Sequence, residues 1–199
     1  MRAIVVGFPK AGTTTLQTAL TASGLRCGHW LRGARPIGKL VYDGWFERDD
    51  PFAYLKDLDV LTQMDVCLPL LRLNHWPNLD IPLLLAIRHR YPSCVFILNA
   101  RPPERIADSM GRWRSMRWRL GSASIPGLPR GRGYRAAELE RWAAAHYAAI
   151  RHVFASDPAF LDLDIAHPEA PARLGASLGI DIRWWGVANA NARRPAGAG

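Results

Sequence analysis

Cysteine is scarce in this sequence of 199 residues, and its placement argues against the sites that cysteine usually builds. The three cysteines, Cys27, Cys67 and Cys94, are widely spaced, form no CxxC pair and have no histidine partner at metal-ligand spacing. Zinc sites and disulfide frameworks need paired or closely spaced ligands. We therefore expect reduced, mostly buried thiols and no bound metal.

Long apolar runs are also missing. No stretch reaches the roughly 20 apolar residues needed to span a bilayer. The first twelve residues, MRAIVVGFPKAG, contain one basic residue before the loop and only a short apolar run, which is unlike a signal peptide or an anchor. We expect a cytoplasmic protein without a membrane span.

Lysine is the other rare residue. Only Lys10, Lys39 and Lys56 are present, so arginine supplies nearly all of the formal net charge of +9. Such a charge suits anionic ligands, including nucleotides and sulfated or phosphorylated substrates. The basic and aromatic residues lack the interleaved pattern of single-strand binders, and we expect no nucleic-acid partner. The position of Lys10 is more informative than the total charge.

Length and composition fit one domain, because 49% of the residues are hydrophobic and can bury a sizeable core. We assign residues 1–188 to this domain and expect residues 189–199 to form a flexible tail. The oligomeric state cannot be read from the sequence.

The apolar pattern alternates between short buried strands and amphipathic helices. It predicts strands over 3–6, 94–98 and 160–163, and helices over 13–23, 79–90, 136–154 and 170–178, with a further helix after Pro103. On that helix Ile106, Met110 and Trp113 share one face. Residues 27–59 read as irregular, and residues 120–133 as a polar, broken loop that suits a mobile lid. This order predicts an α/β fold: three layers, α/β/α, around a central parallel sheet.

The first predicted strand runs directly into Gly7-Phe8-Pro9-Lys10-Ala11-Gly12-Thr13-Thr14. In a Walker A loop, G-x-x-x-x-G-K-[ST], backbone N–H groups surround a phosphate and the lysine after the second glycine reaches the terminal phosphates. Here Thr13 stands at that lysine position, and the lysine lies inside the loop instead. This departure argues against a P-loop kinase or hydrolase, which stays as an alternative. A non-catalytic nucleotide-binding protein is another.

The loop resembles that of sulfotransferases that use 3′-phosphoadenosine 5′-phosphosulfate (PAPS), whose 5′-phosphosulfate loop reads P-K-S/A-G-T-T after the first strand. Residues 9–14 match it at every position. The resemblance implies a P-loop nucleotide-hydrolase-like sulfotransferase fold, PAPS as cofactor, adenosine 3′,5′-bisphosphate (PAP) as product, and a small-molecule acceptor. It implies that the cofactor-binding residues of the loop are Pro9, Lys10, Ala11, Gly12, Thr13, Thr14 and Thr15.

The resemblance also implies a site for the 3′-phosphate, formed by an arginine after a core strand and a serine on the next helix. Arg101 follows the strand that ends at Leu98, and Ser109 lies eight residues further on. A guanidinium fork and a hydroxyl can together bind a phosphate dianion. Such a site would select PAPS over ATP, which lacks a 3′-phosphate.

The implied reaction is in-line transfer of a sulfuryl group to an acceptor hydroxyl or amine. Lys10 would stabilise charge on the leaving oxygen, and a general base would accept the acceptor's proton. His29 and Asp65 are the candidates for this base. His29 is preferred, because the ordinary pKa of histidine lies near neutrality.

Two further expectations concern the acceptor and the lid. Trp30, Trp45 and Trp76 occur in the segments where an acceptor pocket should form. Two of them in the cleft would indicate an aromatic or lipidic acceptor, although core packing is the commoner role of tryptophan. Arg130 and Arg132 are candidates for closing over the 3′-phosphate, but they are not assigned to the site.

Overall fold

The fold is built on a sheet whose strands follow the order β4-β3-β2-β5-β1-β8-β9 in a computed structural model that describes residues 1–113 and 115–188. Five adjacent strands are parallel: β2 (Cys27–His29), β5 (Val60–Gln63), β1 (Ala3–Val5), β8 (Val95–Ala100) and β9 (Phe160–Asp164). Two short antiparallel strands, β3 (Leu31–Arg32) and β4 (Arg35–Pro36), extend one edge. The predicted tail, 189–199, lies outside the described residues.

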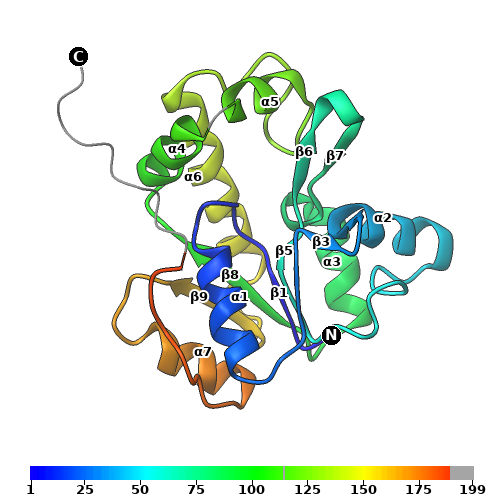
Figure 1. Ribbon diagram of the computed structural model, residues 1–199, viewed down its shortest axis with the longest axis vertical. Coiled ribbons are helices and arrows are strands. Elements are labelled where there is room, and N and C mark those ends of the chain that lie inside the picture. Colours follow the sequence, from blue (N-terminus) through cyan, green and yellow to red (C-terminus); the bar gives the residue numbers. More distant parts are fainter. Residues whose placement is uncertain (114, 189–199) are drawn as a thin grey trace.

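Helices flank this parallel sheet (Figure 1). They are α1 (Thr13–Ala22), α2 (Ile37–Arg48), α3 (Ile81–Arg90), α4 (Pro103–Arg112), α5 (Met116–Ser122), α6 (Ala136–Val153) and α7 (Ala170–Leu178), with short 3-10 turns at Pro69–Leu71 and Pro77–Leu79. The arrangement confirms an α/β fold with a central parallel sheet and is compatible with three layers. None of the helices within the described ranges has the length and apolarity required to cross a membrane.

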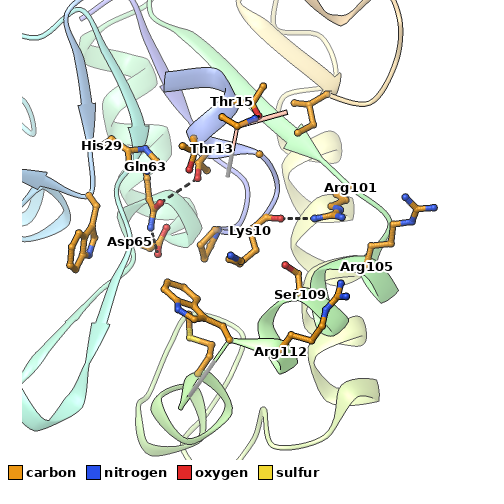
Figure 2. Close-up of a pocket in the computed structure, with 18 of the residues that line it drawn as sticks. Lys10, Thr13, Thr15, His29, Gln63, Asp65, Arg101, Arg105, Ser109 and Arg112 are labelled. Atoms are coloured by element: carbon orange, nitrogen blue, oxygen red, sulfur yellow. Dashed lines mark hydrogen bonds between the residues drawn. The ribbon is translucent and has the colours of Figure 1, made fainter. Parts of the chain in front are cut away.

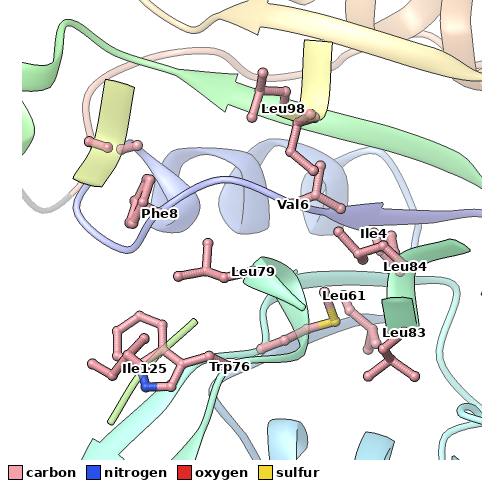
Figure 3. Close-up of a cluster of buried hydrophobic side chains, with 14 of the residues drawn as sticks. Ile4, Val6, Phe8, Leu61, Trp76, Leu79, Leu83, Leu84, Leu98 and Ile125 are labelled. Carbon is pink, nitrogen blue, oxygen red and sulfur yellow. The ribbon is translucent and has the colours of Figure 1, made fainter. Parts of the chain in front are cut away.

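The central strand β1 explains how the sheet divides the core. Ala3 and Val5 belong to a cluster with residues of α1 and α7, whereas Ile4 and Val6 belong to a separate cluster with residues of α2, α3 and α6. Successive side chains of a strand point to opposite faces, so a continuous apolar run can fill two cores. Figure 3 shows the second cluster, in which Phe8, at the start of the phosphate loop, lies near Leu79 and Val6. The loop is therefore anchored in the core.

Several local predictions were wrong. Residues 27–59 contain β2, β3, β4 and α2 in place of an irregular segment. A hairpin of β6 (Val66–Leu68) and β7 (Leu73–His75) was not foreseen. Trp113 is not on the buried face of α4: it follows the helix as its C-cap and is 41% exposed.

The segment 120–133 is also packed more closely than expected. Its first residues belong to α5, and Leu120, Ile125 and Leu128 are buried in the main core. The indole Nε1–H of Trp142 donates a hydrogen bond to the carbonyl of Pro126 at 2.8 Å. The three leucine and isoleucine side chains provide enough apolar surface to hold a segment that is otherwise polar and rich in glycine. The expectation that it is too polar and broken to pack was therefore wrong.

Candidate functional site

A cavity of about 940 Å³ opens at the carboxyl ends of β1, β5 and β8. The loop after β1 forms its floor, and residues that follow β5 and β8 form two walls. Figure 2 shows Lys10 between these walls, with Arg101, Arg105, Ser109 and Arg112 on one side and His29, Gln63 and Asp65 on the other. Ligands of open parallel α/β sheets bind at this edge. The topology thus brings together segments that are far apart in the sequence.

The loop between β1 and α1 is held by two buried asparagines. The Nδ2 atom of Asn99 donates to the carbonyls of Phe8 and Ala11 at 3.2 and 3.1 Å. The Nδ2 atom of Asn78 donates to the carbonyl of Gly7 at 2.8 Å. With three loop carbonyls engaged by side chains behind the loop, its backbone conformation is fixed before any ligand arrives.

Two glycines are required by this geometry. A Cβ atom on Gly7 would lie 2.1 Å from Oδ1 of Asn99, so only glycine permits the close approach of the asparagine. Gly12 has a φ of 82°, in the left-handed region, and a Cβ there would lie 1.8 Å from Cδ1 of Ile165. Lys10 adopts a left-handed φ of 67° without that freedom, a conformation that costs energy for a non-glycine residue.

Helix α1 presents its N-terminus to the cavity. Its N-cap is Gly12, and no side chain caps the helix. The first N–H groups of an α-helix have no partner within the helix and attract anions. Thr13, Thr14 and Thr15 all line the cavity next to these groups. The Oγ1 of Thr15 accepts a hydrogen bond from the backbone N–H of Ala188 at 3.3 Å.

Positive charge dominates the cavity. Lys10, Arg101, Arg105, Arg112 and Arg119 line it. Burial lowers the pKa of Lys10, and the neighbouring charges of Arg101 and Arg112 lower it further. The ammonium of Lys10 lies 5.0 Å from the centre of the Trp113 ring. An anion in this cavity would relieve the repulsion among these groups.

Arg101 connects the two predicted phosphate motifs. Its Nη1 atom donates to the backbone carbonyl of Lys10 at 2.9 Å, across 91 positions of sequence. Ser109 lies on the cavity wall formed by α4 and is 3% exposed. The helical spacing places Arg105, Ser109 and Arg112 on neighbouring turns of the same face. Both predicted 3′-phosphate residues therefore lie in the same cavity as the loop.

Asp65 is buried beside the loop. Burial raises the pKa of its carboxyl group to about 7, an effect that hydrogen bonds from its own backbone and from Gln63 reduce in part. The Nε2 atom of Gln63 donates to Oδ2 of Asp65 at 3.3 Å, and its Oε1 atom accepts from the hydroxyl of Thr13 at 3.3 Å. A chain of hydrogen bonds thus runs from the start of α1 to Asp65 (Figure 2).

The tautomer of His29 follows from its neighbour. The hydroxyl of Thr62 donates its only hydrogen to the carbonyl of Gly28 at 3.1 Å. Nδ1 of His29 lies 3.0 Å from the same hydroxyl oxygen, so Nδ1 carries the hydrogen and donates it. In the neutral ring, Nε2 then keeps its lone pair. Burial lowers the pKa of His29.

Most of the residues predicted from the sequence lie around the cavity. These are Pro9, Lys10, Gly12, Thr13, Thr14, Thr15, His29, Asp65, Arg101 and Ser109. The side chain of Ala11 is instead fully buried in the core, and only its backbone remains for a ligand. Trp30 lines the cavity, but Trp76 is a core residue, 2% exposed. Arg132 forms an ion pair with Glu138 and does not line the cavity.

Sequence reasoning missed several residues of the site. Gln63, Arg105, Arg112, Trp113 and Arg119 all line the cavity. The helical spacing after Arg101 could have indicated Arg105 and Arg112, because residues at these positions share a helix face with Ser109. Asn99 had a signal of its own, since a polar residue at the end of a buried strand needs hydrogen-bond partners. Arg119 lies on the short helix α5, directly before the predicted loop 120–133, where the sequence pattern predicts no element.

Two sequence comparisons found no match: no model of a known protein family matches the chain, and no curated protein matches it. Among residues 1–113 and 115–188, no group of three or more histidine, cysteine, aspartate or glutamate side chains could hold a metal ion.

Proposed function

We propose that this chain is a sulfotransferase that moves a sulfuryl group from PAPS to a hydroxyl, or an amine, of a small-molecule acceptor. The observation that carries the proposal is that two motifs share one cavity: the loop with Lys10, and the pair Arg101 and Ser109. The first suits a 5′-phosphosulfate, and the second suits a 3′-phosphate. Few nucleotides other than PAPS and PAP would use both.

The residues present fit such a cofactor. The cavity's volume of about 940 Å³ lies within the range of small-molecule sites, roughly 300–1,000 Å³. The uncapped N-terminus of α1 and Lys10 are donors for one anionic group. A second anionic group has donors on the wall formed by α4, namely Arg101, Arg105 and Ser109. No carboxylate within the described ranges forms an ion pair with either of these two arginines.

PAPS supplies an activated sulfuryl group. In the proposed reaction, the acceptor oxygen forms a bond to sulfur while the bond from sulfur to the 5′-phosphate oxygen breaks. The acceptor's proton passes to a base, and the products are a sulfate ester and PAP. Lys10 would stabilise the charge that develops on the released phosphate oxygen. His29, with its free Nε2 lone pair, and the buried Asp65 are the candidate bases.

The alternatives make different demands on the same residues. A P-loop kinase or hydrolase would use the lysine that Thr13 replaces, and it would not require a 3′-phosphate site. A non-catalytic nucleotide-binding protein would not require a half-buried lysine inside the loop, held against the repulsion of two arginines. Comparing the binding of PAP with that of ADP distinguishes a sulfotransferase from a P-loop kinase or hydrolase. Measuring the effect of removing Lys10 distinguishes it from a non-catalytic binding protein.

Calorimetric titration with PAP and with ADP tests the cofactor. We expect PAP to bind at least about tenfold more tightly, since one charge-assisted phosphate contact contributes roughly 1.5–3 kcal/mol. Ser109→Ala and Arg101→Ala should weaken PAP binding and leave ADP binding largely unchanged. Because Arg101 also holds the carbonyl of Lys10, a parallel loss of ADP affinity would indicate a distorted loop. Tighter binding of ADP than of PAP by the wild type would overturn the proposal.

Transfer is then measured as sulfate ester formed from PAPS over a panel of phenols, alcohols and amines. Lys10→Ala should lower turnover by at least about a hundredfold, the effect of removing one group that stabilises developing charge. Its affinity for PAP should fall by less than about tenfold. Arg130→Ala, which removes a charge outside the cavity, serves as the matched control. Equal turnover of Lys10→Ala and the wild type would contradict the assigned role.

A further inference from the structure

The cavity extends beyond the two phosphate motifs into a compartment between the β6–β7 hairpin and α5. Val66, Cys67 and Leu68 line it from the hairpin, and Met116 and Arg119 line it from α5. The thiol of Cys67 donates to the backbone carbonyl of Arg119 at 3.4 Å, which joins the two walls. The compartment is therefore mostly apolar, with one cationic side chain.

The guanidinium of Arg119 is held by an aromatic ring. It lies 5.6 Å from the centre of the Trp113 ring, within the range of a cation–π contact. Of the carboxylates in the part of the chain that the structure describes, none forms an ion pair with Arg119. Stacking fixes the plane of a guanidinium and leaves its edge for hydrogen bonds. Arg119 lines the cavity and therefore has donors available for an anionic group of a ligand.

Asp65 and Arg119 are an acidic and a basic side chain from two different walls of the cavity, and Cys67 lies close to the first along the chain and contacts the backbone of the second. Asp65 and Cys67 both line the cavity and lie two residues apart, so their Cα atoms are about 7 Å apart along an extended chain. The thiol of Cys67 in turn contacts the backbone carbonyl of Arg119. Burial raises the pKa of this thiol to about 11, while the charge of Arg119 lowers it and that of Asp65 raises it further. Cys67 therefore connects Asp65 and Arg119, and all three residues line the same cavity.

This arrangement specifies the shape of an acceptor. Its reacting hydroxyl would lie at the end where Asp65 and His29 are found, and its body would contact Val66, Leu68 and Met116. The far end of the acceptor would meet Arg119. This residue lies on α5, whereas the proposed phosphate contacts come from the loop and from α4. A neutral acceptor would leave a positive charge without a partner in a partly desolvated compartment, which is costly.

We infer that the acceptor is a hydroxyl compound with an apolar body and an anionic group, such as a carboxylate, that pairs with Arg119 at the opposite end from the reacting hydroxyl. The inference rests on the proposed sulfotransferase function. On this inference, Arg119 is the residue that selects acceptors by their charge.

Three phenols of the same size and different charge provide the test. They are 4-hydroxyphenylacetate, which is anionic, 4-hydroxyphenylacetamide, which is neutral, and tyramine, which is cationic. Their dissociation constants are measured by calorimetry with protein saturated with PAP. For the wild type we expect the anion to bind at least about tenfold more tightly than the amide, and tyramine to bind most weakly.

Charge reversal at Arg119 should reverse this order. Arg119→Glu should bind tyramine more tightly than the anion, and Arg119→Gln should bind the anion and the amide about equally. Arg117→Glu is the matched control, because Arg117 lies on the same helix, is exposed and does not line the cavity. It should keep the order of the wild type. All variants are first compared with the wild type by their affinity for PAP.

The outcomes separate this inference from the proposed function. Failure of the wild type to bind PAP would overturn the sulfotransferase proposal itself. Normal binding of PAP, combined with equal binding of the three phenols, tightest binding of tyramine or no binding of any, would overturn only the anionic acceptor. An order that Arg119→Glu leaves unchanged would also overturn it, because another group would then be selecting the charge.

Discussion

Replacing Asp65 by asparagine should stabilise the protein, and the gain should grow as the pH rises from about 5 to 7. Asp65 is 6% exposed, and burial raises the pKa of its carboxyl group from an ordinary value of 3.8 to about 7. Asparagine has the same shape, and its Oδ1 atom can still accept the hydrogen bond from Gln63. The substitution therefore removes the titration and keeps the packing.

The sign and size follow from proton linkage. In the folded state Asp65 keeps its proton up to about pH 7, whereas in the unfolded state it loses the proton near pH 4. Between these values the folded state binds more protons, so the stability that this group contributes falls as the pH rises. The slope is about 1.4 kcal/mol per pH unit, and it flattens near the folded pKa. The free energy of unfolding of Asp65→Asn should gain about 2 kcal/mol over the wild type between pH 5 and pH 7.

Urea unfolding at several pH values, followed by tryptophan fluorescence, measures this difference. Because all other groups titrate in both proteins, their contributions cancel in the difference between the two curves. Asp181→Asn, which replaces an exposed aspartate, should show no comparable trend. A difference between Asp65→Asn and the wild type that stays constant from pH 5 to pH 7 would refute the reasoning, since Asp65 would then titrate alike in both states.

Two further predictions concern the base and the loop. If Asp65 is the base, turnover plotted against pH should fall on the acid side with a midpoint near pH 7. If His29 is the base, burial places this midpoint below 6.5. In that case His29→Asn should abolish the acid-side fall in transfer assays. For the loop, Asn99→Leu should lower PAP affinity by at least about tenfold in calorimetric titration, because the carbonyls of Phe8 and Ala11 lose their shared donor. An unchanged affinity would mean that the loop holds its shape without Asn99.

Sequence patterns predicted the strand and the helix on either side of the phosphate loop. They did not predict the elements that form the cavity wall opposite α4. The run Ala3–Val5 and the loop that follows could be recognised because a buried parallel strand and a glycine-rich turn have local signatures. Likewise, Arg101 could be singled out because it follows a strand, and it lines the cavity. The cavity walls opposite α4 depend instead on tertiary packing. The hairpin β6–β7 has strands of three residues each, too short for a periodic signal.

The misread segment near residue 120 shows the same limit. Leu120 and Leu128 are buried through contacts with distant parts of the chain, and glycine and proline between them obscure any period. Arg119 directly precedes this segment on α5, so its place in the cavity depends on the same tertiary packing and could not be predicted from local pattern. Buried asparagines were missed for a related reason, since hydrogen bonds such as that from Asn78 to Gly7 join residues 71 positions apart.

The hydrogen bond from Thr13 to Gln63 links occupancy of one half of the cavity to the other. A hydroxyl has one hydrogen, and in this structure Thr13 gives it to the amide oxygen of Gln63. An anion at the start of α1 that accepted this hydrogen would leave the amide oxygen without a donor, beside Asp65. Both lone pairs of that oxygen would then be open to a hydroxyl in the other half of the cavity, whereas Thr13 occupies one of them in this structure. Under the proposed function, such an exchange of partners would favour binding of the nucleotide before the acceptor, without movement of the backbone.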